Sequence, residues 1–171
     1  MKHVATRFRL FAVDKNDNHD PKTGRFAKTG TGGKALPGFK VIESTKADAE
    51  YYKRLLEKHS GDHVRAAIEY IGNKFSGRCI SIKVGDKTEY AYFTHASKGK
   101  LKNCVNTDAI KAELISYIGE VLTECEYHQR NVIVGSKHEH DGTIVFHEYR
   151  KSINLNGVDY DVQVDVRARS T

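Results

Sequence analysis

The chain has 171 residues, of which 39% are hydrophobic and 29% are charged. This length and composition are typical of one globular domain with a core of its own, and they exclude a collagen, a chain-long coiled coil and a fully disordered protein. No apolar run reaches the ~18 residues needed to span a bilayer, so we expect no contact with a membrane. Three scattered cysteines and the lack of a secretory signal over residues 1–13 predict a reducing, cytoplasmic compartment.

The charge balance is basic, with a formal net charge of +6. Such a balance suits an anionic partner such as nucleic acid. Residues 1–33 hold seven basic and three acidic residues, so the rest of the chain carries only +2. Two interpretations stay open: a surface that binds nucleic acid, and a basic tail that aids solubility.

The chain divides near residue 38. Residues 14–38 are crowded with Gly, Asp-Pro and Pro-Gly turn signals and contain little apolar surface. We therefore predict a basic N-terminal tail and flexible linker over residues 1–38, and a single α+β domain over residues 39–171.

Two helices and a hairpin are expected at the start of this domain. Thr45 is placed to cap a helix over residues 46–58, and Asp62 to cap a second helix directly after it. The apolar period then changes to two, which predicts a hairpin of strands 79–84 and 88–94.

The longest helix is expected after Thr107, and strands follow it at 132–134, 143–155 and 158–168. An apolar stripe at helical spacing defines the helix: Ile110, Leu114, Ile118, Val121, Leu122 and Cys125. The predicted fold is therefore α+β, with N-terminal helices followed by an antiparallel sheet of four to five strands packed on one long helix.

Asn156-Gly157 predicts a two-residue type I′ turn between the last two strands. This turn sets a register in which residues pair as Leu155–Val158, Ile153–Tyr160, Lys151–Val162, Tyr149–Val164 and His147–Val166. Because side chains alternate between faces, the valines predict a core face. The opposite face, with Asp159, Asp161, Gln163, Asp165 and Arg167, is predicted to be solvated.

Nine histidines are many for this length, and four of them lie in three groups that could carry chemistry. RNA cleavage without a metal needs one group to accept the 2′-hydroxyl proton, another to protonate the leaving 5′-oxygen, and a cation to stabilise the phosphate. A tyrosine can orient the sugar or stack on a base. Candidate groups are His95 with Lys98, Lys100 and Lys102; His138 with His140; and His147 with Tyr149, Arg150 and Lys151.

Each candidate also has a structural interpretation. His95 and the lysines can lie on an exposed strand end, and the His138/His140 pair can belong to a solvated loop. His147 and Tyr149 fall on the apolar face, where both can be core residues. The sequence leaves these alternatives open.

A zinc site competes with these interpretations. Cys125-x-x-His128 and His138-x-His140 offer four ligands of the types that zinc accepts. Their spacing lacks the compact arrangement of zinc fingers, and Cys125 lies on the apolar stripe. We therefore expect no metal and no other cofactor.

Two segments resemble phage proteins. Residues 18–27 contain Asp20-Pro21-Lys22-Thr23-Gly24-Arg25-Phe26, which resembles the D-P-x-x-G-R-F stretch of phage head-associated proteins that carry toxin-like domains. The C-terminal half resembles the phage-associated members of the barnase, EndoU, colicin and RelE-like nuclease superfamily. The resembling pieces are Tyr92-Phe93-Thr94-His95 with residues 98–102, the long helix to Glu126, residues 146–151 and residues 156–162.

This resemblance implies a metal-independent ribonuclease that leaves a 2′,3′-cyclic phosphate and a 5′-hydroxyl. It implies RNA as a partner, an immunity protein or phage head proteins as further partners, and a place in the cytoplasm or the virion. The alternative is a non-catalytic, phage head-associated domain that binds nucleic acid or protein. The implied catalytic residues are His95, Lys98, Lys100, His147, Tyr149 and Arg150, and the substrate-binding residues are His138, His140, Lys102 and Lys151.

Overall fold

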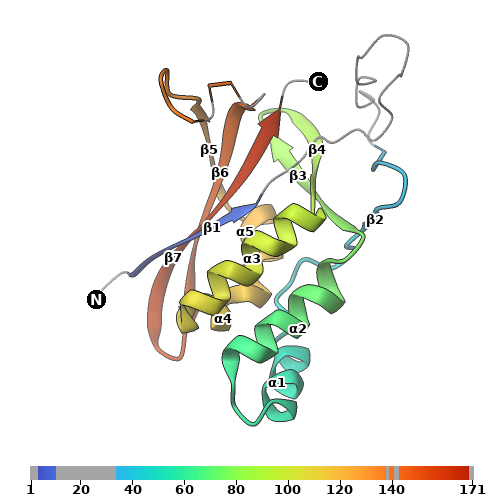
Figure 1. The fold of residues 1–171 in the computed structure, drawn as a ribbon, viewed down its shortest axis with the longest axis vertical. Helices are drawn as coiled ribbons and strands as arrows, with labels where there is room; N and C mark the ends of the chain where they lie inside the picture. The colour runs from blue at the N-terminus through green and yellow to red at the C-terminus, as the bar shows by residue number, and fades with distance from the viewer. Residues whose placement is uncertain (1–3, 11–33, 138, 141–142, 170–171) are drawn as a thin grey trace.

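The computed structural model describes residues 4–10, 34–137, 139–140 and 143–169 (Figure 1). Helices and strands mix along the chain, so the predicted α+β class is confirmed. In chain order the elements are β1 (Val4–Leu10), β2 (Lys40–Val41), α1 (Ala49–Lys58), α2 (His63–Phe75), β3 (Arg78–Val84), β4 (Lys87–Tyr92), α3 (His95–Thr107), α4 (Ala109–Leu114), the 3₁₀ turn η1 (Ile115–Tyr117), α5 (Ile118–Thr123), β5 (Glu126–Asn131), β6 (Thr143–Leu155) and β7 (Val158–Arg169).

The strands form two sheets, so the prediction of one antiparallel sheet on one long helix was wrong. The first sheet has the order β1-β7-β6-β5, with β1 parallel to β7 and the other pairs antiparallel. The second has the order β2-β3-β4, with β2 parallel to β3. The predicted hairpin of strands 79–84 and 88–94 is confirmed as β3–β4, but it belongs to the second sheet.

Residues 4–10, which we expected in the basic tail, instead form the edge strand β1. Their register runs from Val4 opposite Tyr160 to Leu10 opposite Val166. The sequence of this segment alternates apolar and polar residues, which is the ordinary signal of a strand with one buried face. The predicted linker at 11–33 lies outside the described residues.

The β6–β7 hairpin has the predicted turn and register. Asn156 and Gly157 have φ values of 53° and 82°, and a type I′ turn needs positive φ at both positions. All five predicted pairs are observed, from Leu155–Val158 to His147–Val166. The prediction for the opposite face was wrong at Asp165 and Arg167, which are only 2% and 8% exposed.

The first two helices begin at aspartate caps. The side chain of Asp62 accepts a hydrogen bond from the Arg65 amide and starts α2, as predicted. The expected cap at Thr45 was wrong, because the side chain of Asp48 accepts from the Tyr51 amide and starts α1 three residues later. Residues 42–48 therefore form an irregular connection between β2 and α1.

Residues 95–107 were expected to begin as a loop, and they form helix α3 instead. The Thr94 side chain accepts a hydrogen bond from the Ser97 amide and caps the helix. Ser97, Leu101 and Val105 are fully buried at spacings of four, so the helix has a core-facing stripe. The stripe is narrow and begins with a serine, and the helix contains Gly99, which is why the pattern did not predict a helix.

The predicted long helix over residues 108–125 is divided into α4, η1 and α5. Asp108 caps α4 in place of the expected Thr107, accepting hydrogen bonds from the amides of the second and third helical residues. Residues 115–119 are Ile, Ser, Tyr, Ile and Gly, all weaker helix formers than Ala or Leu. This run explains why the helix tightens into a 3₁₀ turn there.

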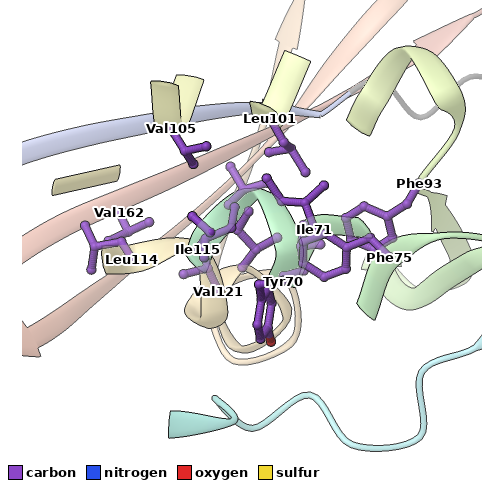
Figure 2. Close-up of a cluster of buried hydrophobic side chains, with 14 of the residues drawn as sticks. Tyr70, Ile71, Phe75, Phe93, Leu101, Val105, Leu114, Ile115, Val121 and Val162 are labelled. Atoms are coloured by element: carbon purple, nitrogen blue, oxygen red, sulfur yellow. The ribbon is translucent and has the colours of Figure 1, made fainter. Parts of the chain in front are cut away.

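The core lies between the inner face of the first sheet and the helices (Figure 2). Phe75 at the end of α2 stacks on Phe93 after β4, with ring centroids 4.1 Å apart. In Figure 2 this stack lies at one side of the cluster, next to Ile71, and Val162 and Leu114 lie at the other side. No helix in the described part of the chain is long and apolar enough to cross a membrane.

Tyr149 joins the two sheets. Its side chain is 1% exposed on the inner face of β6, and its hydroxyl donates a 3.0 Å hydrogen bond to the carbonyl of Lys83 in β3. Burial raises the pKa of the Tyr149 hydroxyl, so this group stays a donor at all physiological pH values.

We expect Tyr149→Phe to lower the free energy of unfolding by about 1 kcal/mol, because it removes one buried hydrogen bond without leaving a cavity. Chemical denaturation measures this change. Tyr117→Phe is the control, since the half-buried Tyr117 hydroxyl has no hydrogen-bond partner among the described residues. Equal stability of the two variants would contradict a role for the Tyr149 hydroxyl in joining the sheets.

Candidate functional site

The first predicted group lies on helix α3. His95 is the exposed first residue of this helix, and Lys100 and Lys102 are exposed further along it. Lys98 donates a 2.9 Å hydrogen bond to the Ser76 hydroxyl, which follows the C-terminal end of α2. The group is therefore a basic helix surface, not the strand-end loop that we expected.

The second predicted group is divided between the two faces of the first sheet. His147 and Tyr149 point to the inner face, with 5% and 1% exposure. Arg150 lies on the opposite face, because successive residues of a strand alternate. Lys151 returns to the inner face, where its ammonium group is 2.8 Å from Glu124 and 3.5 Å from Glu120. These carboxylates raise the pKa of Lys151 and neutralise its charge.

The structure does not bring these two groups together. Tyr149 contacts Lys83 near the turn of the β3–β4 hairpin, whereas Lys98 contacts Ser76, just before β3 begins at Arg78. Five residues of extended strand separate Arg78 from Lys83, which is roughly 16 Å. An imidazole from the α3 group and one from the β6 group therefore do not reach the same phosphate.

Of the third predicted group, only His140 is among the described residues. His138 lies outside the described residues. The side chain of His140 is 89% exposed, and its Nε2 atom is 3.8 Å from the Glu139 carboxylate. This agrees with the alternative of a solvated loop.

His147 is a core histidine in this structure. It shares a 2.9 Å hydrogen bond with the Tyr127 hydroxyl through Nδ1, and the two rings lie against each other with centroids 5.7 Å apart. Burial lowers the pKa of His147, because the charged imidazolium would be poorly solvated there. A neutral imidazole on the inner face of the sheet, with Nδ1 already bonded to Tyr127, is not positioned as a catalytic base.

A different set of chemical groups meets on the outer face of the first sheet. We call it the outer-face cluster: His128 and Arg130 on β5, Glu148 and Arg150 on β6, and Asp165 on β7. The strand register places His128 directly opposite Glu148, and Glu148 directly opposite Asp165. Three adjacent strands therefore present an imidazole and two carboxylates in one row.

Two arginines surround the central carboxylate of the outer-face cluster. Arg130 Nε donates a 2.6 Å hydrogen bond to Glu148 Oε1, and Arg130 Nη2 is 4.0 Å from Asp165 Oδ2. Arg150 Nη2 is 3.6 Å from Glu148 Oε2. The guanidinium of Arg130 also lies 4.3 Å above the ring of Phe146, which holds it in place.

Exposure increases outward through the outer-face cluster. The side chains of Glu148 and Asp165 are only 5% and 3% exposed, whereas those of Arg130 and Arg150 are 34% and 58% exposed. Buried carboxylates are rare unless they are paired, and pairing here comes from the arginines that cover them. The cluster thus offers solvent a cationic surface with an acid–base pair beneath and beside it.

Of the outer-face cluster, only Arg150 was predicted to be a catalytic residue. His128 was considered as a zinc ligand and Asp165 as a solvated residue, whereas Arg130 and Glu148 were given no role. The reason is that residues 126–131 were not predicted to be a strand; the strand was expected at 132–134. In the structure Ile133 and Val134 are 67% and 85% exposed and follow the end of β5. Tyr127 is the one apolar residue in Glu126-Tyr127-His128-Gln129-Arg130, so no apolar–polar alternation marks this strand in the sequence.

The zinc ligands considered from sequence do not form a site among the described residues. No group of three or more His, Cys, Asp or Glu side chains there could hold a metal ion. Burial raises the pKa of the Cys125 thiol to about 11, and zinc binds the thiolate. The environment of Cys125 therefore disfavours the form that a metal needs.

The lowered pKa of His147 predicts a pH dependence of stability. Below pH ~6.5 the unfolded chain binds a proton at this residue that the folded chain resists, so stability falls as the pH decreases. His147→Gln should remove this component, which is at most about 1.4 kcal/mol per pH unit. Denaturation midpoints of both proteins between pH 7 and pH 5 test this, and parallel pH profiles would contradict it.

Comparison of the chain with protein-family models, with curated proteins and with solved structures found no match. The site must therefore be interpreted from its own geometry, and the resemblance to phage nucleases stays a prediction.

Proposed function

We propose that the chain is a metal-independent ribonuclease that acts at the outer-face cluster. The observation that carries this proposal is the buried Glu148 carboxylate, flanked by two arginines and placed opposite His128. A base, an acid and phosphate-binding cations are the groups that transphosphorylation needs. The activity is the one that the resemblance implies, but the residues are largely different.

Each member of the outer-face cluster has a role in this proposal. Arg130 and Arg150 cover the Glu148 carboxylate, and in this proposal they turn from it to the phosphate when RNA binds. Glu148 then accepts the proton of the 2′-hydroxyl as it attacks phosphorus, and His128 protonates the departing 5′-oxygen. Arg130 and Arg150 bind the phosphate oxygens and stabilise the charge that develops on them, as guanidinium groups do with two parallel hydrogen bonds. The products are a 2′,3′-cyclic phosphate and a 5′-hydroxyl.

The strand geometry supports this assignment of acid and base. Residues directly opposite each other in an antiparallel pair have Cβ atoms about 5 Å apart, so the longer Glu148 and His128 side chains can lie on two sides of one phosphate. A rigid sheet also holds such groups with little motion, which favours catalysis by positioning. The partly exposed arginines lie where the substrate arrives.

The proposal predicts that total RNA incubated with the protein in excess EDTA is cut into fragments with 2′,3′-cyclic phosphate ends. His128→Gln and Glu148→Gln should each lower the rate at least 100-fold, the usual size of a general acid or base effect. His128 is exposed, so its replacement should leave the thermal midpoint unchanged and separates chemistry from folding.

His95→Gln is the matched control for these variants, since His95 is equally exposed but lies on α3. It should cleave at the wild-type rate. Loss of activity in His95→Gln with full activity in His128→Gln would overturn the outer-face cluster and favour the site predicted from sequence. Intact RNA with folded wild-type protein would reject the ribonuclease proposal itself.

A non-catalytic nucleic-acid-binding domain is the second candidate, and helix α3 favours it. The helix carries Lys98, Lys100 and Lys102 together with His95 and contains no acidic residue. His95, Lys98 and Lys102 follow one flank of the helix and Lys100 follows the other, so cations lie on both sides of its exposed face. Such a basic surface is the usual footprint of phosphate-backbone binding. Such binding would accompany cleavage in a nuclease and would occur without cleavage in a head-associated binding domain.

Replacement of Lys100 and Lys102 by Gln should weaken RNA binding at low salt. It should also lower the slope of log K against log salt concentration by roughly 0.7 for each lost phosphate contact. Fluorescence anisotropy with a labelled single-stranded RNA measures both quantities. Lys53→Gln/Arg54→Gln, two exposed cations on α1, is the control of equal charge. The same decrease in both double variants would show that only net charge matters, and α3 would not be the binding surface.

A further inference from the structure

A pocket of about 630 Å³ lies on the other side of the molecule from the outer-face cluster. The segment 41–48 forms one wall, and residues of α1, α2, β3, η1 and α5 form the rest. Helix α5 packs on the inner faces of β6 and β7, so this helix and the sheet separate the pocket from the outer face. Nothing in the proposed cleavage reaction uses this pocket.

The wall formed by residues 41–48 is held firmly in place. The amides of Lys40 and Ile42 donate hydrogen bonds of 2.8 Å and 2.9 Å to the carbonyls of Gly77 and Cys79. At the other end, the backbone of Thr45 lies directly on α5 at Gly119, where a Cβ atom would come within 3.2 Å of the Thr45 carbonyl oxygen. Gly119 is therefore needed for this close approach, and the pocket is a built feature of the fold.

Among the charged side chains that line the pocket, positive charges without an ion pair outnumber negative ones. Lys74 is 3.0 Å from Asp48 and lies 4.4 Å above the ring of Tyr51, so both of these charges are satisfied. Lys46 and Arg78 also line the pocket, and neither side chain makes a hydrogen bond or an ion pair within the described ranges. The remaining acidic residue at the pocket is the exposed Glu43.

The other lining groups suit a phosphorylated ligand. Ser44, Thr45 and Ser116 contribute hydroxyl groups, which both donate and accept hydrogen bonds. The planar guanidinium of Arg78 matches two phosphate oxygens, and Lys46 supplies a second positive charge. The ring of Tyr51 is fixed by a 2.8 Å hydrogen bond from Asn73 Nδ2 and forms a rigid aromatic wall.

We propose that this pocket binds a phosphate monoester of mononucleotide size, with Arg78 and Lys46 holding the phosphate. The volume falls within the range of about 300–1,000 Å³ that is usual for small-molecule sites. The same chemistry is offered by a free nucleotide and by the terminal phosphate of an RNA strand. The site is independent of the outer-face cluster, so neither proposal rests on the other.

Isothermal titration calorimetry with AMP and with adenosine tests the proposal on the full chain. AMP should bind saturably, whereas adenosine should give no binding at the same millimolar concentrations. Arg78→Gln and Lys46→Gln should each weaken AMP binding roughly tenfold or more, as expected for a lost charge-assisted hydrogen bond. Arg65→Gln is the control, because Arg65 is 76% exposed on α2 and does not line the pocket.

A 5′-phosphorylated trinucleotide and its 5′-hydroxyl counterpart distinguish the two sources of phosphate. Tighter binding of the phosphorylated trinucleotide than of AMP would identify an RNA end as the ligand, and tighter binding of AMP would identify a free nucleotide. Absence of saturable binding by any phosphorylated probe would overturn the proposal. So would AMP affinity that is unchanged in folded Arg78→Gln and Lys46→Gln, or equal affinity for AMP and adenosine.

Discussion

The register of the β6–β7 hairpin is the constraint on which both faces of the first sheet depend. A type I′ turn at Asn156-Gly157 pairs the strands so that Val162, Val164 and Val166 all point to the helices. A shift by one residue would exchange the two faces, placing Glu148 and Asp165 in the apolar core. The same turn that buries the valines therefore brings the charged residues of three strands together on the outer face.

Burial of two carboxylates in the outer-face cluster costs free energy, and this cost indicates a role other than stabilising the fold. Removing a carboxylate from water is unfavourable, and pairing with an arginine usually offsets the cost rather than exceeding it. Glu148 and Asp165 are nevertheless buried, although well-packed apolar residues often stabilise a protein as much as a buried ion pair does. Such an arrangement is easier to understand as a prepared binding or catalytic surface than as a stabilising device.

The candidate residues named from sequence were chosen by residue type, and the structure separates them by face and by distance. His147 and Tyr149 are three residues and one residue from Arg150 in sequence, but the first two are buried on the inner face and the third is on the outer face. His95 and Lys98 lie at the opposite end of β3 from Tyr149. Proximity in the sequence of a strand thus does not place side chains in one site, because every second residue points away.

Local signals in the sequence determined the α+β class, helix α2 with its Asp62 cap, the β3–β4 hairpin and the register of β6 on β7. Each of these depends on turn chemistry or on periodicity within about 15 residues. Tertiary structure alone decided the division into two sheets and the parallel pairing of β1 with β7. The outer-face cluster belongs to this second group, because His128, Glu148 and Asp165 become neighbours only when three strands pair, and pairing between distant segments leaves no local pattern in the chain.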